Sequence, residues 1–279
     1  MKYRALLKIR FLSVLIIVPP VLVAVWFGGL AFAILLAFIG GGIGYELSCM
    51  ASIKSRFRAG VIISIGTSIP LIAVFAGIQA ALVMTIFGTV IWFFMIFFNV
   101  SKPKDRLGIF AIGFLSLLAI LSLILLRSAE FGGIAITIYL IAVVTGVDSG
   151  AYFAGRSIGG PKLAPSISPN KTWAGLAGGT IAAGFVGLLF FYAPALGGNE
   201  VIVLGAFDSG VVGALAISCI IAPLAQSGDL MESWIKRRRR LKDSGNLIPG
   251  HGGILDRVDG YLTAAPVVAL IAYCMRGGA

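Results

Sequence analysis

Charged residues and histidine are scarce in this sequence. Only 12% of its 279 residues are charged, whereas 59% are hydrophobic, and histidine occurs once, as His251. Soluble domains carry about 25% charged residues, so a soluble fold is a poor default. The single histidine also excludes mechanisms within this chain that need a histidine pair or a histidine-rich metal site, and leaves such work to carboxylates.

The sequence also lacks cysteines at the spacing of a metal or disulfide site, and it lacks the glycine-rich motifs that bind nucleotides. Cys49, Cys219 and Cys274 lie in or beside apolar runs, without the spacing of a metal site or a disulfide framework, and are interpreted as packing residues. Neither a GxxxxGK[ST] phosphate loop nor a GxGxxG motif after a strand occurs. We therefore expect no soluble-type nucleotide-binding domain.

Hydrophobic runs fill most of the chain. A membrane span needs about 20 mostly apolar residues, and the runs predict spans at 11–27, 29–48, 60–77, 80–100, 108–126, 131–148, 174–195, 201–225 and 260–276. The sequence thus predicts an all-α integral membrane protein, a polytopic bundle of about nine transmembrane helices. We expect a single membrane domain over 1–279, with spans 1 to 4 in 1–107 and the catalytic helices and loops in 108–279.

Lysine and arginine gather between alternate spans. With the N-terminus in the cytoplasm, 20 of the 22 fall in inside segments, and only Arg127 and Arg276 lie outside; the inside segments are 1–10, 49–59, 101–107, 149–173 and 226–259. This positive-inside pattern explains the net charge of +11 without nucleic acid as a partner. It predicts a multi-pass protein of the cell membrane with its C-terminus outside, and with an uncleaved first span rather than a signal peptide.

Asp229 directly follows an apolar run at the start of the inside segment 226–259. On a helix that continues past it, Glu232, Ser233 and Lys236 lie three, four and seven residues further on, on one face. Such a face suits a metal ion and a polyphosphate, and an ordinary amphipathic extension is the alternative. The basic residues 236–240 mainly indicate attraction to anionic lipid headgroups.

Two further features follow in the same segment. The run 246–253, NLIPGHGG, predicts a tight turn whose backbone N–H groups can approach a phosphate. Asp256 and Asp259 are three residues apart, which predicts both carboxylates on one face of the first turn of the last helix. Because Mg²⁺ typically takes one or two carboxylates together with substrate phosphates, this pair favours metal or substrate binding.

A second polar stretch covers 148–175. Asp148 ends the sixth span, and Arg156, Lys162 and Lys171 follow among Gly, Pro and Ser residues that suit nucleotide phosphates. A basic loop that merely obeys topology is an equal alternative. Glycines four apart, at Gly40/Gly44 and Gly175/Gly179, allow close helix approach; in a chain with 37 glycines they leave a homodimer open rather than predict it.

Together the two stretches resemble the phosphatidate cytidylyltransferases, or CDP-diacylglycerol synthases. The family's C-terminal pattern is met by Ser233, Lys236-Arg237, Lys242-Asp243, Gly245, Pro249, His251-Gly252-Gly253, Asp256-Arg257 and Asp259. The upstream segment from Asp148 to Thr172 also matches. Ala174 stands where that family commonly has Glu, and Ser149 where Thr is frequent.

The resemblance implies transfer of a cytidylyl group from CTP to phosphatidic acid, which gives CDP-diacylglycerol and pyrophosphate in phospholipid biosynthesis. It assigns Mg²⁺, with a second cation left open, to Asp229 and Asp256, with Asp259 nearby. Since the attacking phosphate is already an anion, no general base is required, and His251 is interpreted as a phosphate or leaving-group contact. The catalytic candidates are Asp229, Asp256, Asp259, Lys242 and His251. The substrate-binding candidates are Asp148, Arg156, Lys162, Ser168, Lys171, Thr172, Glu232, Ser233, Lys236, Arg237, Asp243, Gly252, Gly253 and Arg257.

Two rival functions remain at this point. A CTP-dependent lipid kinase of the polyprenol or phytol type would also use CTP at a membrane, but would transfer the γ-phosphoryl group. An ion-coupled transporter would place acids near the midplane of several spans. Only Glu46 and Asp208 come near an apolar run, and both lie close to span ends or breaks.

Overall fold

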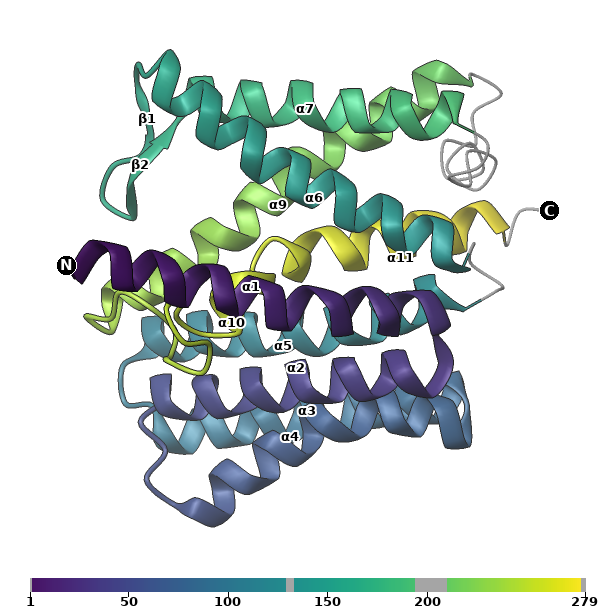
Figure 1. The fold of residues 1–279 in the computed structure, drawn as a ribbon. Helices are drawn as coiled ribbons and strands as arrows, with labels where there is room; N and C mark the ends of the chain where they lie inside the picture. Colours follow the sequence, from purple (N-terminus) through teal and green to yellow (C-terminus); the bar gives the residue numbers. More distant parts are fainter. Residues whose placement is uncertain (1, 129–132, 194–209, 277–279) are drawn as a thin grey trace. The chain divides into compact units, whose positions relative to one another are not determined.

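The computed structural model describes residues 2–128, 133–193 and 210–276, which fold almost entirely into helices (Figure 1). The helices are α1 (Lys2–Phe27), α2 (Gly29–Met50), α3 (Arg56–Ala76), α4 (Ile78–Asn99), α5 (Pro103–Arg127), α6 (Gly133–Ser157), α7 (Trp173–Tyr192), α9 (Val211–Arg238), α10 (Leu255–Val258) and α11 (Tyr261–Arg276). Two short strands, β1 (Lys162–Ala164) and β2 (Ser168–Thr172), form an antiparallel hairpin between α6 and α7.

Seven of these helices are long and apolar enough to cross a membrane, namely α2 to α7 and α9. The apolar parts of α1 and α11 are shorter, Leu15–Phe27 and Tyr261–Met275. The predicted all-α, polytopic membrane fold is confirmed. Parts of the expected spans 131–148, 174–195 and 201–225 lie outside the described residues.

Glycine and a serine cap set the helix boundaries in the N-terminal half. Gly28 and Gly77 have φ values of 64° and 86° and separate α1 from α2 and α3 from α4. Only glycine adopts this left-handed region at little cost. Ser55 caps α3, because its hydroxyl accepts a hydrogen bond from the backbone N–H of Arg58.

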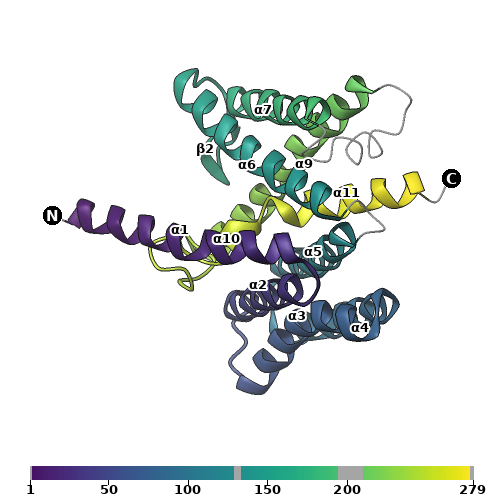
Figure 2. The same ribbon diagram turned by 45° about the vertical axis from the view of Figure 1, so that its right-hand side comes forward.

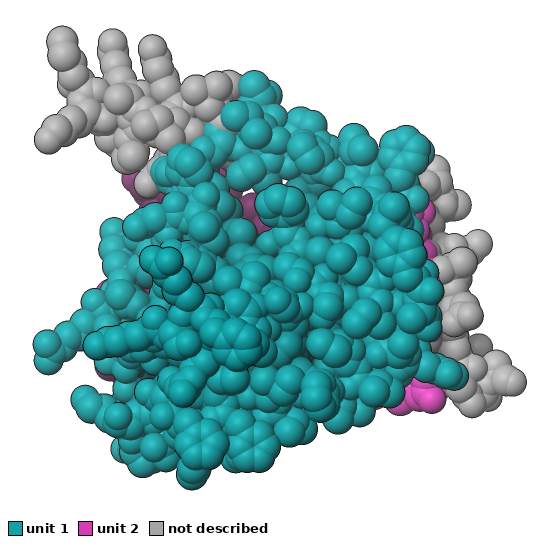
Figure 3. Space-filling model, turned by 90° about the horizontal axis from the view of Figure 1, so that it is seen from below, with its two compact units in different colours: residues 1–124, 235–258 teal, residues 125–234, 259–279 magenta. Residues whose placement is uncertain are grey.

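The chain forms two compact units, coloured separately in Figure 3. The first contains Met1–Ile124 and Ile235–Val258. Within it α2 packs along α3 and α3 along α4 (Figures 1 and 2), and the short helix α10 lies against α2. A Cβ atom on Gly40 or on Gly66 would meet the other's backbone carbonyl, so the close approach of α2 and α3 requires glycine at both positions.

The second unit contains Leu125–Trp234 and Asp259–Ala279. Here α6 packs along α7 (Figures 1 and 2). A Cβ on Gly179 would lie 2.9 Å from the carbonyl oxygen of Val147, and one on Gly175 would lie 3.0 Å from that of Ala151. The glycine faces that left a homodimer open in the sequence are therefore used for packing inside the chain.

Two polar segments between the spans differ from the sequence prediction. Helix α6 continues to Ser157 and the segment after it contains the β1–β2 hairpin, in which Lys162 pairs with Thr172 and Ala164 with Ser168. The prediction that Asp256 and Asp259 share the first turn of the last helix is wrong. Helix α10 ends at Val258, and Asp259 lies in a turn where its Oδ1 accepts a hydrogen bond from the backbone N–H of Gly260 at 2.8 Å. Such a local bond competes with helix continuation.

Candidate active site

Helix α9 carries the first carboxylate of the candidate site. The predicted continuation of this helix past Asp229 is confirmed, since α9 extends to Arg238. Asp229 Oδ2 lies 2.7 Å from the ammonium of Lys171, which comes from β2, and its Oδ1 accepts a 3.1 Å hydrogen bond from Ser233, one turn later. Lys171 also donates to the carbonyl oxygen of Gln226. The second unit thus brings three predicted site residues together.

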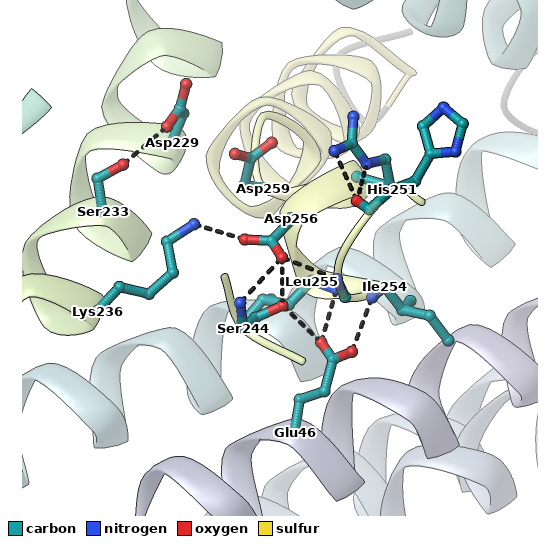
Figure 4. Close-up of polar contacts among 12 residues, drawn as sticks. Glu46, Asp229, Ser233, Lys236, Ser244, His251, Ile254, Leu255, Asp256 and Asp259 are labelled. Carbon is teal, nitrogen blue, oxygen red and sulfur yellow. Dashed lines mark hydrogen bonds and ion pairs between the residues drawn. The ribbon is translucent and has the colours of Figure 1, made fainter. Parts of the chain in front are cut away.

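The first unit carries a corresponding pair, Lys236 and Asp256 (Figure 4). The Lys236 ammonium lies 2.5 Å from Asp256 Oδ1, and both side chains are only 9% exposed. The other oxygen, Oδ2, accepts from the backbone N–H groups of Ser244 and Gly253 at 2.9 and 2.8 Å, and the Ser244 hydroxyl lies 2.9 Å from it. Oδ2 is therefore surrounded by three groups of the 244–253 segment, whereas Oδ1 lies beside the Lys236 ammonium.

These contacts set the protonation state of Asp256. Burial alone raises the pKa of its carboxyl group, but the Lys236 ammonium and the backbone N–H groups of Gly253 and Ser244 outweigh burial, and the pKa lies below its ordinary value. Asp256 is therefore an anion at neutral pH.

The predicted tight turn precedes Asp256. His251 N–H donates to the carbonyl oxygen of Ile248 at 3.0 Å, and Gly250 has a φ of 76°, the arrangement of a type II turn with proline in its second position. The guanidinium of Arg257 donates twice to the carbonyl oxygen of His251. The Nδ1 atom of His251 is buried and has no hydrogen-bond partner among the described residues.

One deeply buried carboxylate borders this turn without belonging to the predicted site. Glu46, near the end of α2, is 0% exposed. Its Oε1 accepts from the backbone N–H of Ile254 at 2.8 Å, and its Oε2 accepts from the N–H of Leu255 and from the Ser244 hydroxyl, both at 2.9 Å (Figure 4). Glu46 therefore binds the segment that carries Asp256.

One known protein family matches nearly the whole chain. The model of the Cytidylyltransferase family matches residues 8–275. The chain belongs to this family. The match includes both polar stretches and all the helices that hold them.

Relatives from two bacterial genera carry the same name. The chain is 45% identical over 163 residues to a protein of Brucella suis biovar 1 (strain 1330) named phosphatidate cytidylyltransferase. The aligned region covers 58% of this chain and 54% of that protein. It is 37% identical over 170 residues to a protein of the same name from Rickettsia prowazekii (strain Madrid E), with 61% and 72% covered. The chain spans about half the length of the Brucella relatives it matches.

In this family member, several other predicted residues serve local structure. The Thr172 hydroxyl accepts from the N–H of Gly175 at 3.0 Å and caps α7. The Gly253 N–H is used by Asp256, and Gly252, with a φ of 82°, pairs with Ile248 in the turn. A role for the Gly253 N–H in binding phosphate would require breaking its bond to Asp256.

The remaining predicted residues are distributed as follows. Arg156 donates to the hydroxyl of Tyr152 on the exposed end of α6. Asp148 and Asp259 both interact electrostatically with Tyr261, whose hydroxyl bonds to Thr145. Glu232 is fully buried. Five predicted residues are exposed or half-exposed, namely Lys162, Ser168, Arg237, Lys242 and Asp243.

Sequence reasoning missed Glu46, Ser244 and Asp105. Asp105, in the first turn of α5, is 4% exposed as a side chain and binds Arg238, with Nε 2.8 Å and a terminal nitrogen 2.7 Å from Oδ1. The signal available for Glu46 was a lone acid close to the inner end of an apolar run. For Ser244 it was a small hydroxyl residue directly before Gly245 in the family pattern.

The donor set fits a hard divalent cation. In the described part of the chain no three acidic, histidine or cysteine side chains cluster as a ready metal cage. Mg²⁺ needs only one or two carboxylates when substrate phosphates supply further oxygens. Each unit by itself contains one such carboxylate, Asp256 in the first and Asp229 in the second, and each is held by fixed donors and paired with a lysine.

Proposed function

We propose that the chain transfers the cytidylyl group of CTP to phosphatidic acid and releases CDP-diacylglycerol and pyrophosphate. The observation that most supports this function is that each unit holds a lysine–carboxylate pair, Lys171–Asp229 and Lys236–Asp256, built from residues of the cytidylyltransferase pattern. The names of the Brucella and Rickettsia relatives support phosphatidic acid as the acceptor.

The chemistry asks for charge neutralisation rather than proton abstraction. A phosphate oxygen of phosphatidic acid attacks the α-phosphorus of CTP, the bond from that phosphorus to the α,β-bridging oxygen breaks, and pyrophosphate leaves with the electron pair. Both substrates are anions, so positioned cations lower the barrier. Lys171, Lys236 and Arg257 are the cations that we assign to the phosphates, and the His251 ring to the leaving group.

We assign Mg²⁺ binding to Asp229 and to Asp256 Oδ1. When bound, Mg²⁺ supplies charge stabilisation at the phosphate oxygens. The chain's own contribution is to fix both carboxylates in orientation, Asp229 through Ser233 and Asp256 through Ser244 and Gly253. We place the reaction at the cytoplasmic face of the cell membrane.

A label-position experiment tests this function. Purified protein in detergent receives phosphatidic acid, MgCl₂ and CTP labelled at either the α- or the γ-phosphorus. We expect the α-label in the lipid fraction and the γ-label in pyrophosphate. A γ-label in the lipid fraction would instead identify a CTP-dependent lipid kinase, and intact CTP in both reactions would return the ion-coupled transporter to consideration. Arg240→Ala, a change at an exposed residue outside the assigned site, serves as the matched preparation control.

A further inference from the structure

Glu46 takes no part in the chemistry proposed above, yet three donors converge on it. It is 0% exposed, and its partners are the backbone N–H groups of Ile254 and Leu255 and the hydroxyl of Ser244. All four residues belong to the first unit. A buried acid costs free energy unless its oxygens are satisfied, so this site is maintained by a specific arrangement of the segment around it.

The glycines of that segment are fitted to the Glu46 carboxylate. A Cβ on Gly245 would lie 2.7 Å from Glu46 Oε1. A Cβ on Gly253 would lie 2.5 and 2.7 Å from the two carboxylate oxygens and would collide with the Ser244 hydroxyl. Real Cβ atoms essentially never come that close. A side chain at either position would therefore displace the Glu46 carboxylate, because the backbone wraps the end of the Glu46 side chain.

Ser244 links this carboxylate to Asp256. Its Oγ lies 2.9 Å from Glu46 Oε2 and 2.9 Å from Asp256 Oδ2. A hydroxyl has one proton, so it donates to only one of the two carboxylates at a time. The hydroxyl therefore ties the position of Ser244, and with it the orientation of the Asp256 carboxylate, to Glu46.

We propose that Glu46 is a positioning residue that fixes the 244–255 segment through Ile254, Leu255 and Ser244 and so holds Asp256 oriented for Mg²⁺. The proposal rests on the function proposed above for the role of the metal. Groups that orient a metal ligand through a hydrogen bond typically alter metal affinity by about 10- to 100-fold when they are removed. Glu46 acts on Asp256 in this way from a helix about 200 residues earlier in the chain.

The variant Glu46→Gln keeps the size of the side chain but replaces one accepting oxygen by a donating amide. At least one of the three donors then loses its acceptor, and the 244–255 segment is held less firmly. Ser48→Ala is the matched control, because Ser48 is also buried in α2 and its hydroxyl bonds only locally, to the carbonyl oxygen of Gly44. Ser244→Ala tests the second half of the link independently, should Glu46→Gln not fold.

Two measurements test the proposal. Hydrogen exchange of the backbone amides of Ile254, Leu255 and Gly253 should accelerate at least about tenfold in Glu46→Gln, with the helices unchanged. The Mg²⁺ concentration for half-maximal turnover should rise about tenfold or more, while the turnover at saturating Mg²⁺ recovers to near that of Ser48→Ala. Ser244→Ala should raise the Mg²⁺ requirement in the same direction.

Each other outcome overturns the proposal. Unchanged amide exchange would show that Glu46 does not hold the segment. Faster exchange with an unchanged Mg²⁺ requirement, or a lower turnover that excess Mg²⁺ does not restore, would leave Glu46 with a purely structural role. If the wild-type chain transfers no cytidylyl group, the proposed function fails by itself, and the exchange data still report on the Glu46 contacts.

Discussion

Asp256 and Lys236 form the ion pair from which the residue-scale predictions follow. Both side chains are 9% exposed, and loss of one partner of a buried pair leaves the other charge uncompensated. Asp256→Asn is therefore expected to lower turnover at least about 100-fold and also to lower the free energy of unfolding by about 3 kcal/mol. Thermal unfolding in detergent and the CTP assay measure the two effects separately.

A double variant separates charge pairing from catalysis. Because Asp256→Asn combined with Lys236→Met removes both charges, we expect it to regain most of the lost stability while turnover stays low. If the double variant is as unstable as Asp256→Asn alone, the ion pair is not the source of the loss. If Asp256→Asn retains wild-type turnover, Asp256 does not belong to the metal site.

The lowered pKa of Asp256 predicts a specific pH dependence of stability. Because the folded chain favours the ionised form, the contribution of Asp256 is fully present above the ordinary aspartate pKa of 3.8 and is lost as the pH falls through the lower, folded-state value. The difference in unfolding temperature between the wild type and Asp256→Asn should stay constant from about pH 8 to about pH 5 and shrink below about pH 4. A difference that already shrinks near neutral pH would contradict the lowered pKa.

Which site residues could be predicted from the sequence depends on how local their contacts are. The face of α9 that carries Asp229 and Ser233 follows from helical spacing alone, and their hydrogen bond spans four residues. Glu46 and Leu255 are 209 residues apart. The apolar run predicts that α2 is a membrane span, but it contains no information about which distant loop folds onto the end of that helix.

At the scale of elements, the end of α9 is fixed to the start of α5 through its basic residues. The sequence interpretation assigned residues 236–240 mainly to lipid headgroups, but the structure pairs Arg238 with the buried Asp105, and Arg239 lies 3.6 Å from the same carboxylate. Arg239 also donates to the hydroxyl of Ser52. Part of this basic run is therefore a structural contact that holds the segment before Ser244.

Arg238→Ala and Arg240→Ala should separate these two roles. Arg238→Ala removes the shorter contact of Asp105 and keeps the longer one to Arg239, so we expect the free energy of unfolding to fall by about 2 kcal/mol. Arg240 is exposed, and its replacement should change stability by less than about 0.5 kcal/mol. Thermal unfolding of both variants at equal lipid and detergent content provides the comparison. Equal effects of the two changes on stability would indicate that residues 236–240 act only as surface charge.

For the whole molecule, composition predicted the class of fold better than it predicted the connections. Long apolar runs necessarily become helices in a bilayer, because every backbone polar group must be satisfied within the segment. That constraint does not act on the polar segments between spans. The β1–β2 hairpin and the separate helix α10 arose there, where the chain is free to bond locally or to a distant acid such as Glu46.

The orientation of the molecule in the membrane is the remaining prediction at this scale. The distribution of Lys and Arg predicts that residues 226–259 lie in the cytoplasm, where CTP is available. In a variant whose three native cysteines are replaced, single cysteines are introduced at Asn246, an exposed residue of this segment, and at Ala76, the exposed last residue of α3.

A membrane-impermeant maleimide should label Ala76→Cys in intact cells and Asn246→Cys only after the inner membrane is made permeable. The positive-inside rule requires this order, because the segment with Asn246 holds seven Lys and Arg residues, which resist translocation. The reverse pattern would place the lysine–carboxylate pairs on the side of the membrane that lacks CTP. It would therefore contradict both the orientation and the proposed reaction, whereas the contacts of Glu46 within the first unit would be unaffected.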